Sequence, residues 1–221
     1  MILPTTSELF DLSHTHSREY LSRFIYPHTA LGGIKEFIIN LSKTLSHSEY
    51  EEISEGVFAA HDTNIARDAT LLPPAIIGHE TDVRCGAFIR GSVIIGDGAV
   101  IGNSTEIKNA VIFDGVQLPH YNYVGDSILG YRAHLGAGAV ISNLRLDHKS
   151  VSIRSEEETV ETGLRKFGAV IGDLTEVGCN SVIFPGTVIG KGCLICPLSP
   201  VRGVIPEKSV FHTDGRVTKR R

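Results

Sequence analysis

Tryptophan is absent from this sequence of 221 residues, and it contains only one methionine and 7% aromatic residues. Few large rings and abundant glycine predict many turns around a core of small or branched aliphatic side chains. No run approaches the ~18 apolar residues of a membrane span. The N-terminus, Met1 to Pro4, lacks the basic and apolar regions of a signal peptide. We therefore expect a cytoplasmic protein that has no membrane partner.

An excess of basic residues is also missing. The formal net charge is −4, and the only basic run is 219–221. No overall positive field attracts nucleic acid, so we expect no nucleic-acid partner. Cysteine is scarce: Cys193 and Cys196 form a CxxC pair, but no second pair of ligands accompanies it. The repeat described below places Cys193 inward, and we expect no metal at this pair.

A six-residue period dominates the chain. Aliphatic residues recur every six positions, and the phase breaks twice; the uninterrupted runs are Ile65 to Phe113, Leu129 to Ile141 and Ile171 to Val201. Most repeats carry a small residue four positions later, and glycine often follows the aliphatic. Each repeat is one short strand and one turn, with the aliphatic inward. Three repeats close a triangular coil, and coils stack because one alone cannot bury its apolar side chains. The period therefore predicts that residues 59–206 form a parallel β-helix of about six coils, so the fold class is all-β.

Residues 1–58 follow a different pattern. Their apolar positions show helical spacing, at Ile34, Phe37, Ile38, Leu41 and Leu45. We expect a small α-helical N-terminal cap over the open first coil, and a C-terminal tail at 207–221. His14 and His16 could bind a metal, but no further ligands lie near them in sequence. No metal is expected.

Two segments interrupt the period, 114–128 and 144–168. Insertions project from a repeat structure and often carry function. The first contains the polar and aromatic stretch Pro119–Tyr123. The acidic run Glu156–Glu158 of the second is more typical of a solvated surface.

Five stretches together carry a resemblance: Arg90, Glu106–Lys108, Pro119–Asp126, Leu135–Gly138 and Asn143–Lys149. They resemble the acetyltransferase domain of the bifunctional UDP-N-acetylglucosamine pyrophosphorylase/glucosamine-1-phosphate N-acetyltransferases. Both the residue types and their spacing match that domain: 18 positions separate Arg90 from Lys108, and 12 more separate Lys108 from His120.

The whole chain is also similar to short free-standing UDP-N-acetylglucosamine pyrophosphorylase-related proteins, in its helical N-terminus and in the stretches 161–168 and 197–206. These resemblances imply a left-handed β-helix, an exception to the usual right-handed crossover. They also imply a homotrimer and acetyl-CoA as co-substrate. Nucleotidyltransferase activity is not expected, because 1–58 is too short for that domain and lacks its Gly-rich phosphate loop.

The resemblance implies a role for each matching residue. His120 is the general base that takes the proton of the sugar amine, and Glu106 orients its ring. Asn143 is the third catalytic position, and the backbone N–H after it meets the developing oxyanion. Arg90 and Lys108 hold the sugar phosphate.

The remaining matches concern substrate and cofactor. Tyr123, His134 and Lys149 are further substrate-binding positions. Acetyl-CoA is expected in a groove between subunits, at the cofactor-binding positions Ala137, Cys179 and Pro197.

Three departures leave the function open. His134 stands where the family has Asn, Leu144 where it has Tyr, and Cys179 where it has Ser. The leading interpretation is an acetyl-CoA-dependent N-acetyltransferase acting on an amino-sugar 1-phosphate. The alternatives are a non-catalytic, trimerising scaffold that binds a sugar nucleotide, and an acyltransferase with another acceptor.

Overall fold

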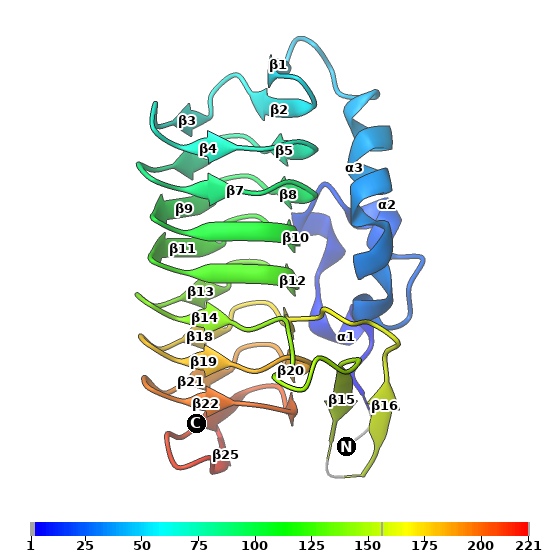
Figure 1. Ribbon diagram of the computed structural model, residues 1–221, viewed down its shortest axis with the longest axis vertical. Helices are drawn as coiled ribbons and strands as arrows, with labels where there is room; N and C mark the ends of the chain where they lie inside the picture. Colours follow the sequence, from blue (N-terminus) through cyan, green and yellow to red (C-terminus); the bar gives the residue numbers. More distant parts are fainter. Residues whose placement is uncertain (1–2, 156, 221) are drawn as a thin grey trace.

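The computed structural model describes residues 3–155 and 157–220. The chain winds into a tall stack of coils with helices along one side (Figure 1). Its strands are short and pair in parallel with the strand one coil above, as the six-residue period predicts. The parallel β-helix expected from the sequence is confirmed, but the stack is taller than the expected six coils, because eight parallel strands follow one another along one face of the described residues.

Three faces make up each coil. Face 1 consists of β3 (Asn64–Ile65), β6 (Asp82–Val83), β9 (Val100–Asn103), β11 (Gln117–His120), β13 (His134–Leu135), β18 (Glu176–Val177), β21 (Leu194–Ile195) and β24 (Ser209–Phe211). Face 2 consists of β4 (Thr70–Leu71), β7 (Phe88–Ile89), the first halves of β10 (Glu106–Ile112) and β12 (Tyr123–Leu129), β14 (Val140–Ile141), β19 (Val182–Ile183) and β22 (Pro200–Val201). Face 3 consists of β2 (Val57–Ala60), β5 (Ala75–Ile77), β8 (Val93–Ile95), the second halves of β10 and β12, β17 (Ala169–Ile171), β20 (Thr187–Ile189) and β23 (Val204–Ile205).

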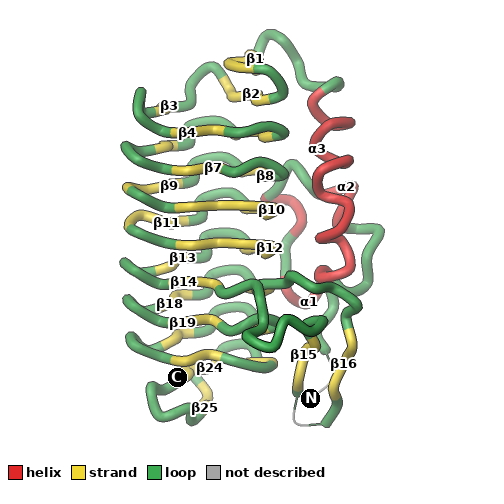
Figure 2. Tube along the Cα trace, viewed as in Figure 1, coloured by secondary structure: helices red, strands yellow, loops and turns green. Residues whose placement is uncertain are grey.

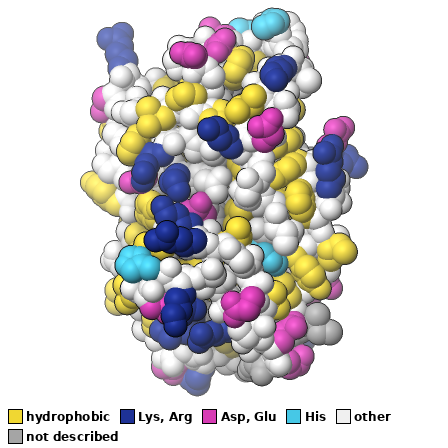
Figure 3. All heavy atoms as spheres, turned by 45° about the vertical axis from the view of Figure 1, so that its right-hand side comes forward, with side chains coloured by type: hydrophobic (Ala, Val, Ile, Leu, Met, Phe, Trp, Pro, Cys, Tyr) yellow, Lys and Arg dark blue, Asp and Glu magenta, His cyan; other side chains and the backbone are white. Residues whose placement is uncertain are grey.

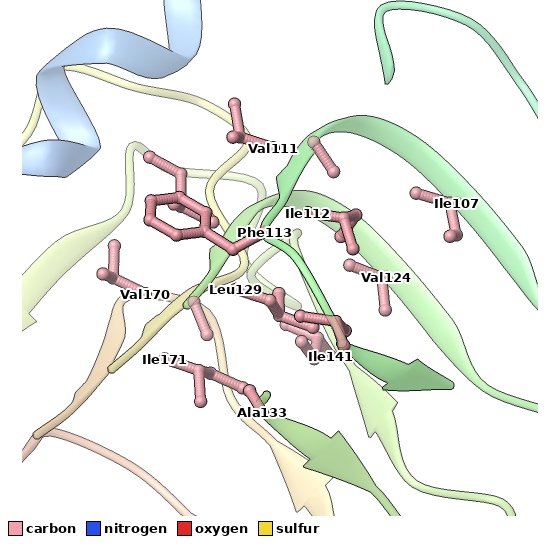
Figure 4. Packing of buried hydrophobic residues seen from close by; sticks show 14 of the residues in the cluster. Ile107, Val111, Ile112, Phe113, Val124, Leu129, Ala133, Ile141, Val170 and Ile171 are labelled. Carbon is pink, nitrogen blue, oxygen red and sulfur yellow. The ribbon is translucent and has the colours of Figure 1, made fainter. Parts of the chain in front are cut away.

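The core is a set of aliphatic columns inside the coils. Ile107 pairs with Val124, which pairs with Ile141, and all three side chains are fully buried. Figure 4 shows these branched side chains stacked from one coil to the next. Truncating one such residue to Ala typically costs about 2–5 kcal/mol of unfolding free energy.

The first interruption, 114–128, is not an outward bulge, so that expectation was wrong. Ile89 pairs with Ile107, whereas Ile95 pairs with Ile112, so the chain has lost one residue at the corner within β10. The following segment returns to register as β11 and β12. Phe113 therefore leaves the strand column and fills a corner, where its ring lies 4.9 Å from that of Phe10.

The second interruption is a true insertion at the corner between faces 2 and 3. It contains an antiparallel hairpin, β15 (Ser152–Arg154) and β16 (Thr159–Glu161), beside the lower coils (Figure 1). Val151, Ile153 and Phe167 are buried and anchor it.

The N-terminal segment lies along the side of the stack. It contains α1 (Thr6–Leu9), η1 (Leu12–His14), α2 (Arg18–Leu21), η2 (Pro27–Gly33) and α3 (Ile34–Ser42). Figure 2 shows the helices beside face 3, where α3 contacts β5, β8 and β10. This differs from the expected cap over the first coil, because the buried residues Ile34 and Ile38 face the side of the solenoid. The first coil instead carries β1 (Tyr50–Ser54), antiparallel to β2.

The coil stack also extends past residue 206. Strand β24 pairs in parallel with β21, and β25 (Val217–Lys219) folds back on it. Cys193 is buried, and its thiol donates to the carbonyl of Pro206 across 2.9 Å. Of the helices within residues 3–155 and 157–220, none has the length and apolar character needed to cross a bilayer.

Candidate active site

Five predicted site residues gather on face 2 and at its corner with face 3. We call this set the polar patch: Arg90, Glu106, Lys108, Tyr123 and Asn143. Glu106 and Tyr123 are register partners on β10 and β12, and Arg90 and Glu106 are joined directly. Parallel stacking thus brings together residues that are up to three coils apart.

Two ion pairs organise the polar patch. Arg90 Nη1 lies 2.5 Å from Glu106 Oε1, and Lys108 Nζ lies 3.6 Å from Asp126 Oδ2. The hydrogen bond and the charge of Glu106 raise the pKa of Arg90. Each cation therefore already has a carboxylate beside it, and both retain further N–H donors for an anionic ligand.

Asp126 is the centre of the patch, and sequence reasoning gave it no role. The residue is only 5% exposed. Its carboxylate accepts hydrogen bonds from Asn109 Nδ2 at 2.8 Å and from Asn143 Nδ2 at 2.5 Å. The available signal was its place in the matching stretch Pro119–Asp126, directly after Gly125.

Because Gly125 has no side chain, the side chains of Tyr123 and Asn143 can approach each other above it. A Cβ at Gly125 would lie 2.6 Å from Asn143 Nδ2 and 2.6 Å from Tyr123 Oη. Burial, and then the charges of Glu106 and Asp126, raise the pKa of Tyr123. Its phenol therefore stays protonated at neutral pH and can donate a hydrogen bond.

A second set forms a column along the corner between faces 1 and 2. We call His120, Ala137, Cys179 and Pro197 the corner column. Backbone hydrogen bonds join successive members of the column. The N–H groups of Gly138, Asn180 and Leu198 donate to the carbonyls of His120, Ala137 and Cys179 at 3.0, 2.9 and 3.0 Å. The structure thus aligns the predicted base with all three predicted cofactor-binding positions. The side chain of His120 is exposed.

Asn122 holds the corner at which His120 lies. The residue is 2% exposed, and its side-chain oxygen accepts the backbone N–H of His120 across 3.2 Å. Its amide donates to the carbonyls of Gly136 at 2.9 Å and Ala139 at 3.1 Å. Asn122 therefore joins two coils beneath the predicted base, a role that sequence reasoning missed.

Three expected relationships are not found. Within residues 3–155 and 157–220, no hydrogen bond or ion pair joins Glu106 to His120. His134 lies on face 1, where its Nδ1 is 2.7 Å from Glu176 Oε2. Lys149 is exposed in the insertion, outside the polar patch.

A groove of about 990 Å³ continues face 2 below the polar patch, between the insertion and the C-terminal hairpin. Its floor includes Val182, Phe184 and Pro200, and the guanidinium of Arg202 lies 4.5 Å from the ring centroid of Phe184. Arg145 lines its upper end and pairs with Asp147 at 2.6 Å. Figure 3 shows Lys and Arg side chains gathered in a band along the long axis of the molecule.

Comparisons with known proteins found similar sequences and folds. The family model of the GMPPB C-terminal domain matches residues 71–165. The bifunctional protein GlmU of Methanococcus maripaludis (strain C5) is 37% identical over 137 residues, which are 61% of this chain and 33% of that protein. A solved hexapeptide transferase family protein from Anaplasma phagocytophilum superimposes with a TM-score of 0.43 at 16% identity, over 75% of this chain and 81% of that one.

A more complete match comes from Escherichia coli (strain K12). Its uncharacterized acetyltransferase YaiX is 35% identical over 156 residues, which are 71% of this chain and 68% of that protein. The chain belongs to the hexapeptide-repeat acyltransferase family. This hexapeptide-repeat acyltransferase spans about a third of the length of the first curated relatives that it matches.

Proposed function

We propose that this acyltransferase moves an acetyl group from acetyl-CoA to the amino group of an amino-sugar 1-phosphate. The observation that carries the proposal is the place of His120. It heads the corner column and is the last residue of β11 on face 1, while the polar patch lies on face 2 of the neighbouring coils. The proposed base therefore lies next to a path for the thioester arm of acetyl-CoA and next to an anion-binding surface. Relatives such as the bifunctional sugar-1-phosphate nucleotidylyltransferase/acetyltransferase of Sulfurisphaera tokodaii, 33% identical over 159 residues, support this substrate class.

His120 is suited to act as the base. Among the described residues its ring has no hydrogen-bond partner, so a ring nitrogen is free to accept a proton from the attacking amine. Acetyl-CoA supplies the acyl group as a thioester. As the new amide bond forms and the C–S bond breaks, His120 holds the amine proton and returns it to the thiolate. An imidazole works in this role because its pKa lies near neutral pH.

The polar patch is suited to hold the sugar phosphate. Arg90 uses one of its five N–H donors on Glu106, and Lys108 has three donors beside Asp126. Charge-assisted bonds from both cations would fix the phosphate. Tyr123 and Asn143 would donate to sugar hydroxyls above Gly125.

The corner column is suited to the arm of acetyl-CoA. Ala137 and Cys179 are small, so an extended chain can approach the backbone there. The column is open on its outer side, and a second copy of the chain would close it in a homotrimer. Light scattering tests this assembly, and a monomeric mass at micromolar concentration would contradict it.

A thiol-release assay tests the reaction. The purified chain is incubated with acetyl-CoA and a panel of amino-sugar 1-phosphates, their unphosphorylated forms and nucleotide-linked amino sugars. We expect turnover that depends on the phosphate, and a loss of about 10²–10⁴-fold in kcat for His120→Ala. His61→Ala is the matched control, because His61 is an exposed histidine on the first coil. A wild-type chain that turns over no amino sugar would favour the scaffold alternative. Wild-type kcat in His120→Ala would exclude this base.

A further inference from the structure

A second cluster of ionisable side chains lies far from the polar patch, at the corner between faces 3 and 1. It consists of His16, Asp97 and Asp114. One potential ligand atom from each lies within 4.8 Å of the other two, and His16 Nε2 is 2.9 Å from Asp97 Oδ1. His16 comes from the N-terminal segment, whereas the two aspartates follow β8 and β10 on successive coils.

Backbone hydrogen bonds fix the two carboxylates. The N–H of Asp97 donates to Asp114 Oδ1 at 2.9 Å, and the N–H of His79 donates to Asp97 Oδ1 at 2.8 Å. The N–H of Asp114 donates to the carbonyl of His14 at 3.1 Å, which places the N-terminal segment over this corner. The cluster is therefore built into the coil stack and leaves carboxylate oxygens for another partner.

Tyr50 supplies a second, independent observation beside this cluster. The residue is only 6% exposed, and its hydroxyl is buried without a hydrogen-bond partner among the described residues. Its ring meets the rings of His16 and His79 edge-on, with centroids 6.3 and 5.2 Å apart. Burial, and then nearby negative charges led by Asp97, raise the pKa of Tyr50. Buried hydroxyls normally have a hydrogen-bond partner, so an unpartnered one in a side chain whose ring contacts that of His16 needs an explanation.

We propose that His16, Asp97 and Asp114 bind one divalent transition-metal ion, with the hydroxyl of Tyr50 facing the ion or a water bound to it. One imidazole nitrogen and two carboxylate oxygens suit Zn²⁺ or Mn²⁺. The ion would replace the proton that His16 shares with Asp97. Its role is structural, because it links the N-terminal segment to two coils at a sequence separation of 81 residues. It takes no part in the acetyl transfer, since the polar patch and the corner column lie on the other two corners.

Metal titration of the full-length chain tests the proposal. The EDTA-treated protein is titrated with Co²⁺, whose visible absorption reports nitrogen and oxygen ligands, and with Zn²⁺ by calorimetry. We expect one equivalent to bind and Zn²⁺ to raise Tm. His16→Gln and Asp114→Asn should weaken binding at least about tenfold, and Tyr50→Phe should alter the Co²⁺ spectrum. His14→Gln is the matched control. The ring of His14 stacks on that of Tyr131, with centroids 3.7 Å apart, and His14 is not one of the three cluster residues.

Three outcomes would overturn the proposal. One is the absence of stoichiometric binding to the wild type, which would leave His16 as a protonated partner of Asp97. Another is equal affinity in the His16→Gln and His14→Gln variants. The third is an intense thiolate-to-Co²⁺ band, which would place the ion at Cys193 and Cys196. If a ligand variant fails to fold, the wild-type stoichiometry and the Tyr50→Phe spectrum still decide the matter.

Discussion

Glu106 Oε1 lies 2.5 Å from Nη1 of Arg90, one coil away, and makes no hydrogen bond to His120 within the described residues. The carboxylate expected to orient the base holds a guanidinium instead. The proposed mechanism therefore assigns two tasks to two places: the base to the corner column, and acceptor binding to the polar patch. Each task can be tested by its own substitutions.

Substitutions in the ion pair should change acceptor binding. Arg90→Ala should raise KM for a phosphorylated acceptor about 10–100-fold, since a hydrogen bond to a charged group contributes roughly 1.5–3 kcal/mol. Glu106→Gln should also act through KM, because its partner is Arg90. Steady-state kinetics check both predictions. Arg84→Ala is the control, because Arg84 lies outside the polar patch and pairs with Asp82 at 2.7 Å. A loss of kcat in Glu106→Gln comparable to that of His120→Ala would restore the orienting role.

Asn122→Ala should lower both stability and turnover. It removes three hydrogen bonds, two of them to carbonyls of the buried residues Gly136 and Ala139, and each such bond contributes roughly 0.5–1.5 kcal/mol. We expect Tm to fall by several degrees, and kcat to fall even well below Tm because His120 loses its fixed corner. Asn122→Asp keeps the acceptor for the His120 N–H and loses both donors, so it should recover kcat more than Tm. Equal losses in the two variants would make Asn122 purely structural.

Gly125→Ala should disrupt the polar patch. Its Cβ would come within 2.6 Å of both Asn143 and Tyr123, so one side chain must move. Overpacking of this kind typically costs about 1–3 kcal/mol, and KM for the acceptor should rise with it. Gly32→Ala is the control, because nothing lies within 4 Å of a Cβ built there. An unchanged KM in Gly125→Ala would remove Tyr123 and Asn143 from the acceptor site.

His28 should make stability depend on pH. The residue is 5% exposed beside Phe167, and burial lowers its pKa below 6.5. Below pH 6.5 the unfolded chain then binds the proton more strongly than the folded chain does. The contribution of neutral His28 is therefore complete above pH 6.5 and is lost as the pH falls towards the lowered pKa. Urea unfolding between pH 7.5 and 5 should show a steeper acid loss for the wild type than for His28→Phe. Parallel pH profiles would contradict this, and His61→Phe should retain the wild-type slope.

The N-terminal helical segment shows what a local sequence pattern can and cannot predict. The spacing of Ile34 and Ile38 predicted an amphipathic helix, and α3 is present. The same spacing says nothing about which surface the helix covers. That surface is face 3, because the strands β5, β8 and β10 offer the apolar side chains there.

The sequence by itself determined the parallel β-helix, because a hexad records strand, corner and inward side chain within six residues. The family resemblance named the members of the corner column, but only pairing between coils shows that His120, from the interrupted segment, aligns with the other three. Only the tertiary structure decided that Asp126 and Asn122 hold the site, that Glu106 pairs with Arg90, and that His16 meets Asp97. These partners lie on neighbouring coils or on a segment that returns from 81 residues away, so no local period encodes them. The lost residue between Ile107 and Ile112 had the same effect: it looks like an interruption along the chain, and only pairing between coils reveals it as a shortened corner.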